Sequence, residues 1–211
     1  MSPDDPGGNT LAAPFPRFRS RPPWWGGDLQ TLRNFFRPPV IDLTPHPAER
    51  LELPMNDGTG DVLLAALNRP AQAASDRRRR PLVILIHGLT GCEESSYMMG
   101  TARYLLDLGY PVMRLNLRGA GPSRAHCRQQ YHAGRSNDLR TVLLKLDGRL
   151  ASQGIFLAAY SLGANMLLKF LGEQAGERRC WARPAFRRQS TSRPRSDASC
   201  AGATGVITIS C

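Results

Sequence analysis

The sequence contains almost no lysine: of the 28 basic residues among its 211, only Lys145 and Lys169 are not arginine. An arginine bias of this kind reflects codon composition as readily as phosphate recognition, and we favour codon composition. The net charge of +11 nevertheless invites a nucleic-acid-binding interpretation. However, Arg77–Arg80 contribute +4 and residues 174–211 contribute +5, which leaves +2 for the rest of the chain. We therefore expect no specific nucleic-acid partner.

A long apolar run is also absent. The longest strongly apolar stretch is Leu82–Ile86, far short of the roughly 20 residues that a membrane-spanning helix requires. The N-terminus carries Asp4 and Asp5 where a secretory signal peptide would carry Lys or Arg. We expect a soluble protein without a transmembrane segment, with peripheral membrane contact at most.

Cysteine occurs in an odd number and without the paired spacing of a zinc site. The five are Cys92, Cys127, Cys180, Cys200 and Cys211. Cys127 lies close to His126 and His132, but this spacing matches no standard set of metal ligands. The glycine-rich stretches lack the further residues of a dinucleotide or P-loop site. We expect a reduced, cytoplasmic location and neither a metal nor another cofactor.

The apolar content of 41% is enough to fill a core, and its distribution divides the chain into three parts. Residues 1–50 form an arm rich in proline and aromatic residues, with a short helix expected over 29–36 before the prolines. We expect the aromatics of this arm to pack on the domain body. Residues 51–174 form the domain, and residues 175–211 form a tail rich in Arg, Ser and Cys.

The domain begins with two predicted strands and then alternates strands with helices. Residues 51–68 read as a hairpin around the turn Asn56–Gly58, and residues 69–80 read as an exposed connection. Short apolar runs then predict strands, and amphipathic segments between and after them predict helices. The predicted strands are 82–86, 112–116 and 155–159, and the predicted helices are 95–108, 136–150 and 162–172. This order indicates a parallel sheet covered by helices on both faces.

Ser161 stands between the third apolar strand and the helix that follows, flanked by the small residues Ala159 and Gly163. A nucleophilic serine on a tight strand-to-helix turn requires small residues at these two positions. The first amide of the following helix, that of Leu162, would help to hold an oxyanion. Taken alone, this pattern is also met by a serine that only caps a helix.

The segment after the first apolar strand favours the nucleophile. His87–Gly91 follows that strand directly, and an HG turn there is where a serine hydrolase places its second oxyanion donor, here the amide of Leu89. We therefore interpret His87 as a structural residue and not as a base. Residues 118–123 form a further glycine-rich turn that borders such a site.

Together these residues resemble the α/β-hydrolase fold and, more narrowly, the YheT-like family of esterases and acylglycerol lipases. The resemblance covers residues 22–174, and Asp28 stands where that family carries His before LQT. The motifs that carry it are GGDLQTLRNFFRP at 26–38, HGLTGCEESSYM at 87–98, GYPVMRLNLRGAGPSR at 109–124, YHAGRSNDLR at 131–140 and AAYSLGANMLLKFLGE at 158–173. The resemblance implies the N-terminal half of the fold: a β-hairpin, a mostly parallel sheet with flanking helices, and then a disordered C-terminal tail.

The resemblance also implies a triad in the chain order Ser, acid, His, with Ser161 forming an acyl-enzyme on a small ester or acylglycerol. The four histidines, however, all precede Ser161, and the one Asp after it is Asp197. They are His46, His87, His126 and His132. We therefore expect the activity of this chain to be absent or impaired. Acyl chain length and the acyl acceptor are not specified by these residues.

The composition of the tail suggests a cause. Residues 175–211 have no helical period, and a frameshift near residue 175 in a GC-rich gene would produce such a sequence. Two alternatives stay open. One is a non-catalytic basic protein that binds nucleic acid or an acidic membrane surface, and the other is a fragment without function.

Overall fold

The computed structural model describes residues 22–23, 25–36, 39–71, 80–174 and 206–207. The chain divides into two compact units, Met1–Pro39 and Val40–Cys211. The described part of the first unit contains helix α1 (Gly27–Phe36), which confirms the short helix expected before the prolines. Packing of the arm's aromatics on the domain body stays a prediction.

The second unit begins with an antiparallel hairpin of β1 (Ala48–Pro54) and β2 (Val62–Asn68). The hairpin was predicted, but its turn is longer than a single Asp-Gly step. The turn is closed by a hydrogen bond from the Met55 amide to the Asp61 carbonyl at 2.8 Å. Gly58 and Gly60 both adopt positive φ there, at 76° and 75°, a conformation that glycine reaches without steric cost.

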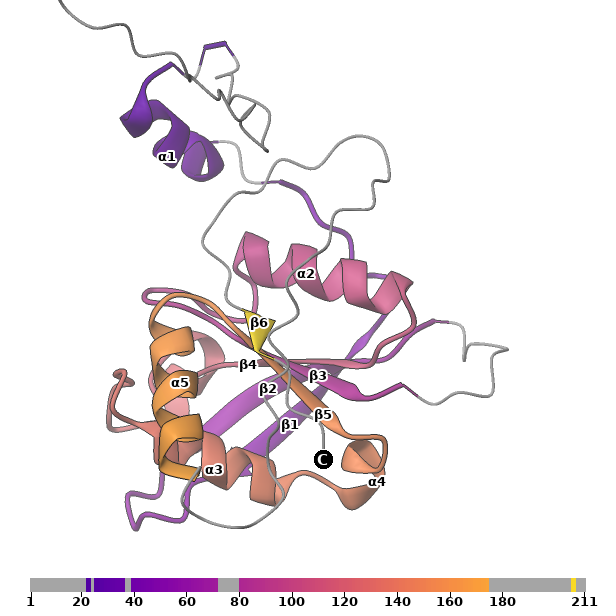
Figure 1. The fold of residues 1–211 in the computed structure, drawn as a ribbon, viewed down its shortest axis with the longest axis vertical. Coiled ribbons are helices and arrows are strands. Elements are labelled where there is room, and N and C mark those ends of the chain that lie inside the picture. Colours follow the sequence, from indigo (N-terminus) through magenta and orange to yellow (C-terminus); the bar gives the residue numbers. More distant parts are fainter. Residues whose placement is uncertain (1–21, 24, 37–38, 72–79, 175–205, 208–211) are drawn as a thin grey trace, which may run out of the picture. The chain divides into compact units, whose positions relative to one another are not determined.

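A sheet with the strand order β1-β2-β4-β3-β5-β6 forms the centre of this unit (Figure 1). β3 (Leu82–Ile86), β4 (Val112–Leu115) and β5 (Ile155–Ala159) are parallel, as predicted. β2 joins them antiparallel to β4, and the two-residue β6 (Val206–Ile207) pairs antiparallel with β5. Apart from β6, the expected disordered tail lies outside the described residues.

The helices follow the predicted positions with three corrections. α2 (Ser96–Asp107) agrees with its prediction, and the 3₁₀ helix η1 (Gly121–His126) was not predicted. The single helix expected over 136–150 is wrong, because the structure has α3 (Ser136–Lys145) and a separate α4 (Gly148–Ala151).

The break between these two helices has a local cause. Leu146 adopts extended backbone with ψ 137°, and the side chain of Asp147 caps α4 by accepting a hydrogen bond from the Arg149 amide at 2.9 Å. α5 (Leu162–Gln174) runs through Gly172, so this glycine does not end the helix as expected.

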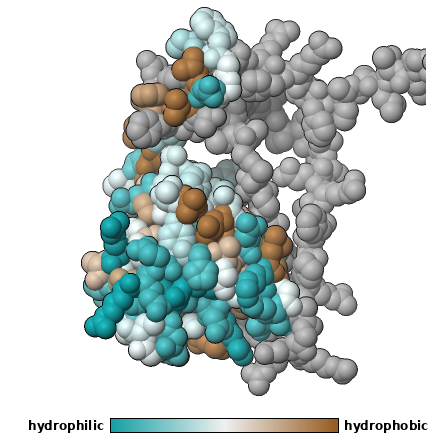
Figure 2. Space-filling model, turned by 90° about the vertical axis from the view of Figure 1, so that its left-hand side faces the viewer, coloured by the Kyte–Doolittle hydropathy of each residue, from teal (hydrophilic) through white to brown (hydrophobic). Residues whose placement is uncertain are grey.

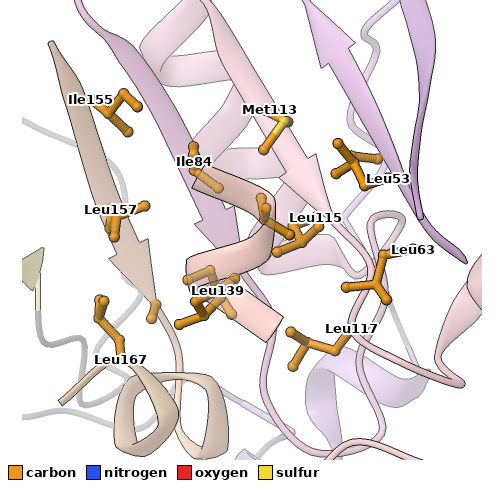
Figure 3. Packing of buried hydrophobic residues seen from close by; sticks show 14 of the residues in the cluster. Leu53, Leu63, Ile84, Met113, Leu115, Leu117, Leu139, Ile155, Leu157 and Leu167 are labelled. Carbon is orange, nitrogen blue, oxygen red and sulfur yellow. The ribbon is translucent and has the colours of Figure 1, made fainter. Parts of the chain in front are cut away.

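The parallel strands are covered on both faces, which is why β3 and β5 are apolar at every position; β4 carries one charged residue, the buried Arg114. Along β3, Leu82, Ile84 and Ile86 face α3 and α5, whereas Val83 and Leu85 face α2. Figure 3 shows Leu139 of α3 and Leu167 of α5 among the leucine and isoleucine side chains of the sheet. Each such side chain contributes about 1.5–3 kcal/mol when fully buried, so the two layers fix the positions of the strand ends.

The described surface on the face in Figure 2 is mainly hydrophilic, with hydrophobic residues gathered in small patches. Among the described residues, no helix has both the length and the apolar content that crossing a bilayer would require.

Candidate active site

The carboxyl ends of β3 and β5 bring two loops together. The strands are parallel neighbours with Ile86 opposite Ala159, so the chain leaves both at the same edge of the sheet. The Tyr160 amide donates to the Ile86 carbonyl at 3.0 Å and extends the pairing by one step. The HG loop, residues 87–92, therefore lies beside Ser161, in agreement with the sequence interpretation.

Ser161 occupies a strained turn. Its φ is 47°, in the left-handed region that non-glycine residues rarely adopt, and its side chain is exposed. α5 begins at the next residue, and the Ser161 carbonyl accepts the amides of Ala164 and Asn165 at 2.9 and 3.2 Å. The tight strand-to-helix turn predicted from the sequence is present.

Two glycines allow the loops to approach this closely. A Cβ on Gly163 would collide with the carbonyl oxygen of His87 and would lie 2.9 Å from Cγ2 of Ile86. A Cβ on Gly88 would lie 3.1 Å from Cβ of Ser161 and 3.2 Å from the Tyr160 carbonyl oxygen. The absence of side chains at both positions lets the HG loop and the N-terminus of α5 meet around Ser161.

The amides of Leu89 and Leu162 have no hydrogen-bond partner within the described part of the chain. The remaining amides of the HG loop between Gly88 and Cys92 all have acceptors. Leu162 is the first residue of α5, where amides have no acceptor inside the helix and the helix dipole favours negative charge. One free amide on the HG loop and one at the start of α5, both beside the Ser161 hydroxyl, are the kind of donors that form an oxyanion hole.

His87 is fully buried, and both nitrogens of its ring contact backbone groups. Nδ1 lies 2.7 Å from the Gly88 carbonyl oxygen, and Nε2 accepts the Leu117 amide at 3.0 Å. Burial lowers the pKa of His87, although the Gly88 carbonyl opposes this shift. The ring is therefore neutral near pH 7, with its proton on Nδ1, and it holds the HG loop against the end of β4.

A buried ion cluster supports the loop after β4, and sequence reasoning missed it. The Arg118 guanidinium contacts Asp61 and Asp138 at 2.7 Å and Asp57 at 2.9 Å. Burial would lower the pKa of Arg118, but Asp138 and Asp61 outweigh it and raise this pKa. Burial would likewise raise the pKa of Asp61, yet the Arg128 amide and Arg118 lower it overall. The cluster joins the hairpin turn, the loop after β4 and the start of α3.

A base for Ser161 does not appear in the described part of the chain, where its Oγ has no hydrogen-bond partner. His46 is buried with Nδ1 near the Arg69 carbonyl and the Ala71 amide, and His132 accepts the Gly134 amide. The structure thus brings Ser161 together with Leu89 and Leu162 but with none of these histidines. The described residues also contain no group of three or more His, Cys, Asp or Glu that could hold a metal ion.

Residues 77–198 match the family model described as serine aminopeptidase, S33. The match continues past residue 174, the expected end of the resemblance. The putative esterase YheT of Escherichia coli K12 is 33% identical over 71% of this chain and 42% of its own length. Human phospholipase ABHD3 is 29% identical over 71% of this chain and 36% of its own length. The yeast monoacylglycerol lipase is 28% identical over 46% of this chain and 22% of its own length.

Among solved structures, the Pyrococcus furiosus esterase Pf2001 resembles this chain with a TM-score of 0.50 and 20% identity. The likeness covers 64% of this chain and 52% of that one, and it concerns the fold. The chain spans about two fifths of the length of YheT and ABHD3, so it corresponds to part of each relative. With its strand order, its strained serine turn and a family match over more than half of its length, the chain belongs to the serine aminopeptidase S33 family and has the α/β-hydrolase fold.

Proposed function

We propose that Ser161 is the nucleophile of a serine hydrolase that acts on carboxylic esters of the esterase or acylglycerol lipase type. The observation that carries this proposal is the exposed hydroxyl of Ser161 on a strained turn, with the free amide of Leu89 on the neighbouring HG loop and that of Leu162 at the start of α5. The names of the relatives, which include an esterase, a phospholipase and a monoacylglycerol lipase, agree with ester substrates.

The proposed reaction begins with attack of Ser161 Oγ on the ester carbonyl carbon. A C–O bond forms, the hydroxyl gives its proton to a solvent water molecule, and the carbonyl oxygen becomes an oxyanion that the amides of Leu89 and Leu162 stabilise. The tetrahedral intermediate then breaks its C–O bond to the alcohol, which takes the proton back from water and leaves, so that an acyl group remains on Ser161. In the second step water or another alcohol attacks the acyl carbonyl carbon, the bond from that carbon to Ser161 Oγ breaks, and Oγ regains a proton through solvent.

Acylation requires a base, since a serine hydroxyl is almost entirely protonated near neutral pH. The described residues place no base at Ser161, and oxyanion donors alone retain only a small part of the catalysis of a triad. We therefore propose that this chain acting alone is impaired: it acylates slowly and deacylates more slowly still.

The substrates are proposed to be small esters or acylglycerols. Leu89 carries an oxyanion amide and is 65% exposed on the same loop, so it presents an apolar group next to the reaction centre. An apolar contact there favours an acyl chain over a polar substituent. We propose a cytoplasmic location, with contact at a membrane surface limited to substrate uptake.

Acyl-enzyme formation tests the proposal directly. The purified chain would be incubated with 4-nitrophenyl butyrate, quenched in acid and weighed by intact mass spectrometry. We expect one butyryl group per chain, on the peptide that contains Ser161, with nitrophenol released in the same amount. Ser161→Ala should show neither. Equal nitrophenol release from Ser161→Ala would exclude Ser161 as the nucleophile.

A further inference from the structure

The amides on the two sides of Leu89 are taken up by tyrosine hydroxyls. Gly88 N–H donates to the hydroxyl oxygen of Tyr97 at 3.1 Å. Thr90 N–H donates to the hydroxyl oxygen of Tyr131 at 2.7 Å. Tyr131 lies 41 residues away in the sequence, in the loop before α3, whereas Tyr97 lies in the first turn of α2. The amide between them, that of Leu89, has no acceptor among the described residues.

Thr90 is held in an unfavourable conformation at this point. Its φ is 58°, in the left-handed region, which is sterically unfavourable for a β-branched residue. The Thr90 amide donates to the Tyr131 hydroxyl, and the Thr90 hydroxyl donates to the Leu89 carbonyl at 2.7 Å. Strain of this kind persists only where surrounding contacts determine the backbone, and these two hydrogen bonds do so on either side of the Thr90 backbone.

Tyr131 is itself fixed on its other sides. Its ring meets the buried ring of His87 edge-on, with centroids 5.4 Å apart and an interplanar angle of 86°. Its amide donates to the Arg118 carbonyl at 2.9 Å, and Arg118 is anchored by the buried ion cluster. The hydroxyl that holds Thr90 is therefore attached to a rigid part of the domain.

Tyr97 connects the HG loop to the serine turn. Its hydroxyl accepts the Gly88 amide, while its ring packs against Tyr160, the residue before Ser161, with centroids 4.7 Å apart. Tyr160 in turn shares a hydrogen bond of 2.5 Å with the Thr101 hydroxyl of α2. Both loops of the site are thus tied to the same helix.

We propose that Tyr97 and Tyr131 are positioning residues for the oxyanion hole: their hydroxyls take the Gly88 and Thr90 amides and leave the Leu89 amide directed at the oxyanion. This inference rests on the proposed function of Ser161. Neither tyrosine touches the reacting atoms. Their effect is on the placement of a donor that acts in the transition state, so it changes the rate of acylation and not the binding of the acyl chain.

Tyrosine-to-phenylalanine variants isolate the two hydroxyls, because the rings and their contacts with His87 and Tyr160 are kept. Tyr104→Phe is the matched control, since Tyr104 lies on α2 and is 65% exposed. Thermal unfolding of each variant would establish that it is folded. The rate of Ser161 phosphonylation would then be measured over a range of alkyl fluorophosphonate concentrations, and amide exchange at Gly88 and Thr90 would be followed by NMR.

We expect the limiting rate of phosphonylation to fall about tenfold in Tyr131→Phe and in Tyr97→Phe, with the half-saturating probe concentration unchanged. Full loss of an oxyanion donor typically costs 10²–10³-fold, so a displaced donor should cost less. Exchange should become faster at Thr90 in Tyr131→Phe and at Gly88 in Tyr97→Phe. Tyr104→Phe should match the wild type in every measurement.

Two results would overturn this inference and leave the proposed function standing, provided that the wild type is labelled at Ser161. One is unchanged amide exchange at Thr90 and Gly88 in the variants. The other is an unchanged limiting rate in the variants; if the half-saturating probe concentration rose at the same time, the tyrosines would have a role in binding. A wild-type chain that is not labelled at all would instead overturn the proposed function, and with it the catalytic part of this inference.

Discussion

Gly88 and Ser161 face each other across the carboxyl ends of β3 and β5, and a Cβ on Gly88 would lie 3.1 Å from the Cβ of Ser161. A methyl group there forces the HG loop and the serine turn apart by a few tenths of an ångström. Gly88→Ala should therefore cost only about 1 kcal/mol in stability. It should slow phosphonylation of Ser161 about tenfold or more, since the Leu89 amide moves with the loop. Urea unfolding and labelling kinetics measure the two effects. A loss of stability with no loss of labelling rate would contradict the proposed place of Leu89.

The two glycines of α5 offer a matched comparison on one helix. A Cβ on Gly163 meets the His87 carbonyl and Ile86, whereas a Cβ on Gly172 meets nothing within 4 Å. Gly163→Ala should lower the free energy of unfolding by about 2–3 kcal/mol. Gly172→Ala should raise it by about 0.5–1 kcal/mol, because alanine is the better helix former. Urea unfolding of both variants checks the sign of each change. Equal effects would contradict the close contact between Gly163 and the His87 carbonyl oxygen.

The buried ring of His87 makes stability depend on pH. Since burial lowers the pKa of His87, the unfolded chain takes up a proton near its ordinary value of about 6.5 while the folded chain does not. The free energy of unfolding should therefore fall as the pH drops from 7 towards 5, and protonation would also break the Leu117 N–H···Nε2 bond.

His87→Gln removes this titration and keeps a side-chain acceptor. The difference in free energy of unfolding between wild type and His87→Gln should change by no more than about 1.4 kcal/mol per pH unit. Denaturant titrations at half-unit steps of pH would measure it. Parallel curves for wild type and variant would mean that His87 titrates alike in the folded and unfolded chains.

Arg118 is fully buried among carboxylates, so we expect it to be important for folding. Its removal leaves Asp61 and Asp138 buried without their cation, so Arg118→Met should cost about 3–5 kcal/mol. Asp57 is 40% exposed, and Asp57→Asn should cost less than about 1 kcal/mol. The exposed Arg124 is the control, with an expected change within about 0.5 kcal/mol for Arg124→Met. Thermal melts should give the lowest Tm for Arg118→Met, a higher one for Asp57→Asn and the highest for Arg124→Met. An Arg118→Met protein as stable as Arg124→Met would contradict a stabilising role of the buried ion cluster.

The parts of the fold that the sequence predicted best are those with both faces buried. β3 and β5 appear as unbroken apolar runs, because a strand covered by helices on both sides has no polar face. The serine turn could also be predicted, since a tight turn at Ser161 requires small residues close to it in the sequence. The break between α3 and α4 was hidden, because Leu146 and Leu150 continue the apolar spacing of the preceding helix across it.

The supporting contacts of the site could not be predicted, because they depend on residues far apart in the chain. Tyr131 and Thr90 are 41 residues apart, and Arg118 and Asp61 are 57 residues apart. A tyrosine hydroxyl that accepts one loop amide leaves no periodic pattern in composition or spacing. Only the topology of the sheet, which brings the ends of β3, β4 and β5 to one edge, places these groups together.

The identity of the residue that an active-site probe modifies tests the central claim most directly. The chain would be treated with an alkyl fluorophosphonate, digested and sequenced by mass spectrometry, alongside Ser161→Ala and the buried-serine control Ser136→Ala. We predict one phosphonyl adduct, on Ser161, that is absent from Ser161→Ala and retained in Ser136→Ala. An adduct that persists in Ser161→Ala, or no adduct together with salt-sensitive binding of the chain to DNA, would contradict the assignment of Ser161 as the nucleophile of a serine hydrolase.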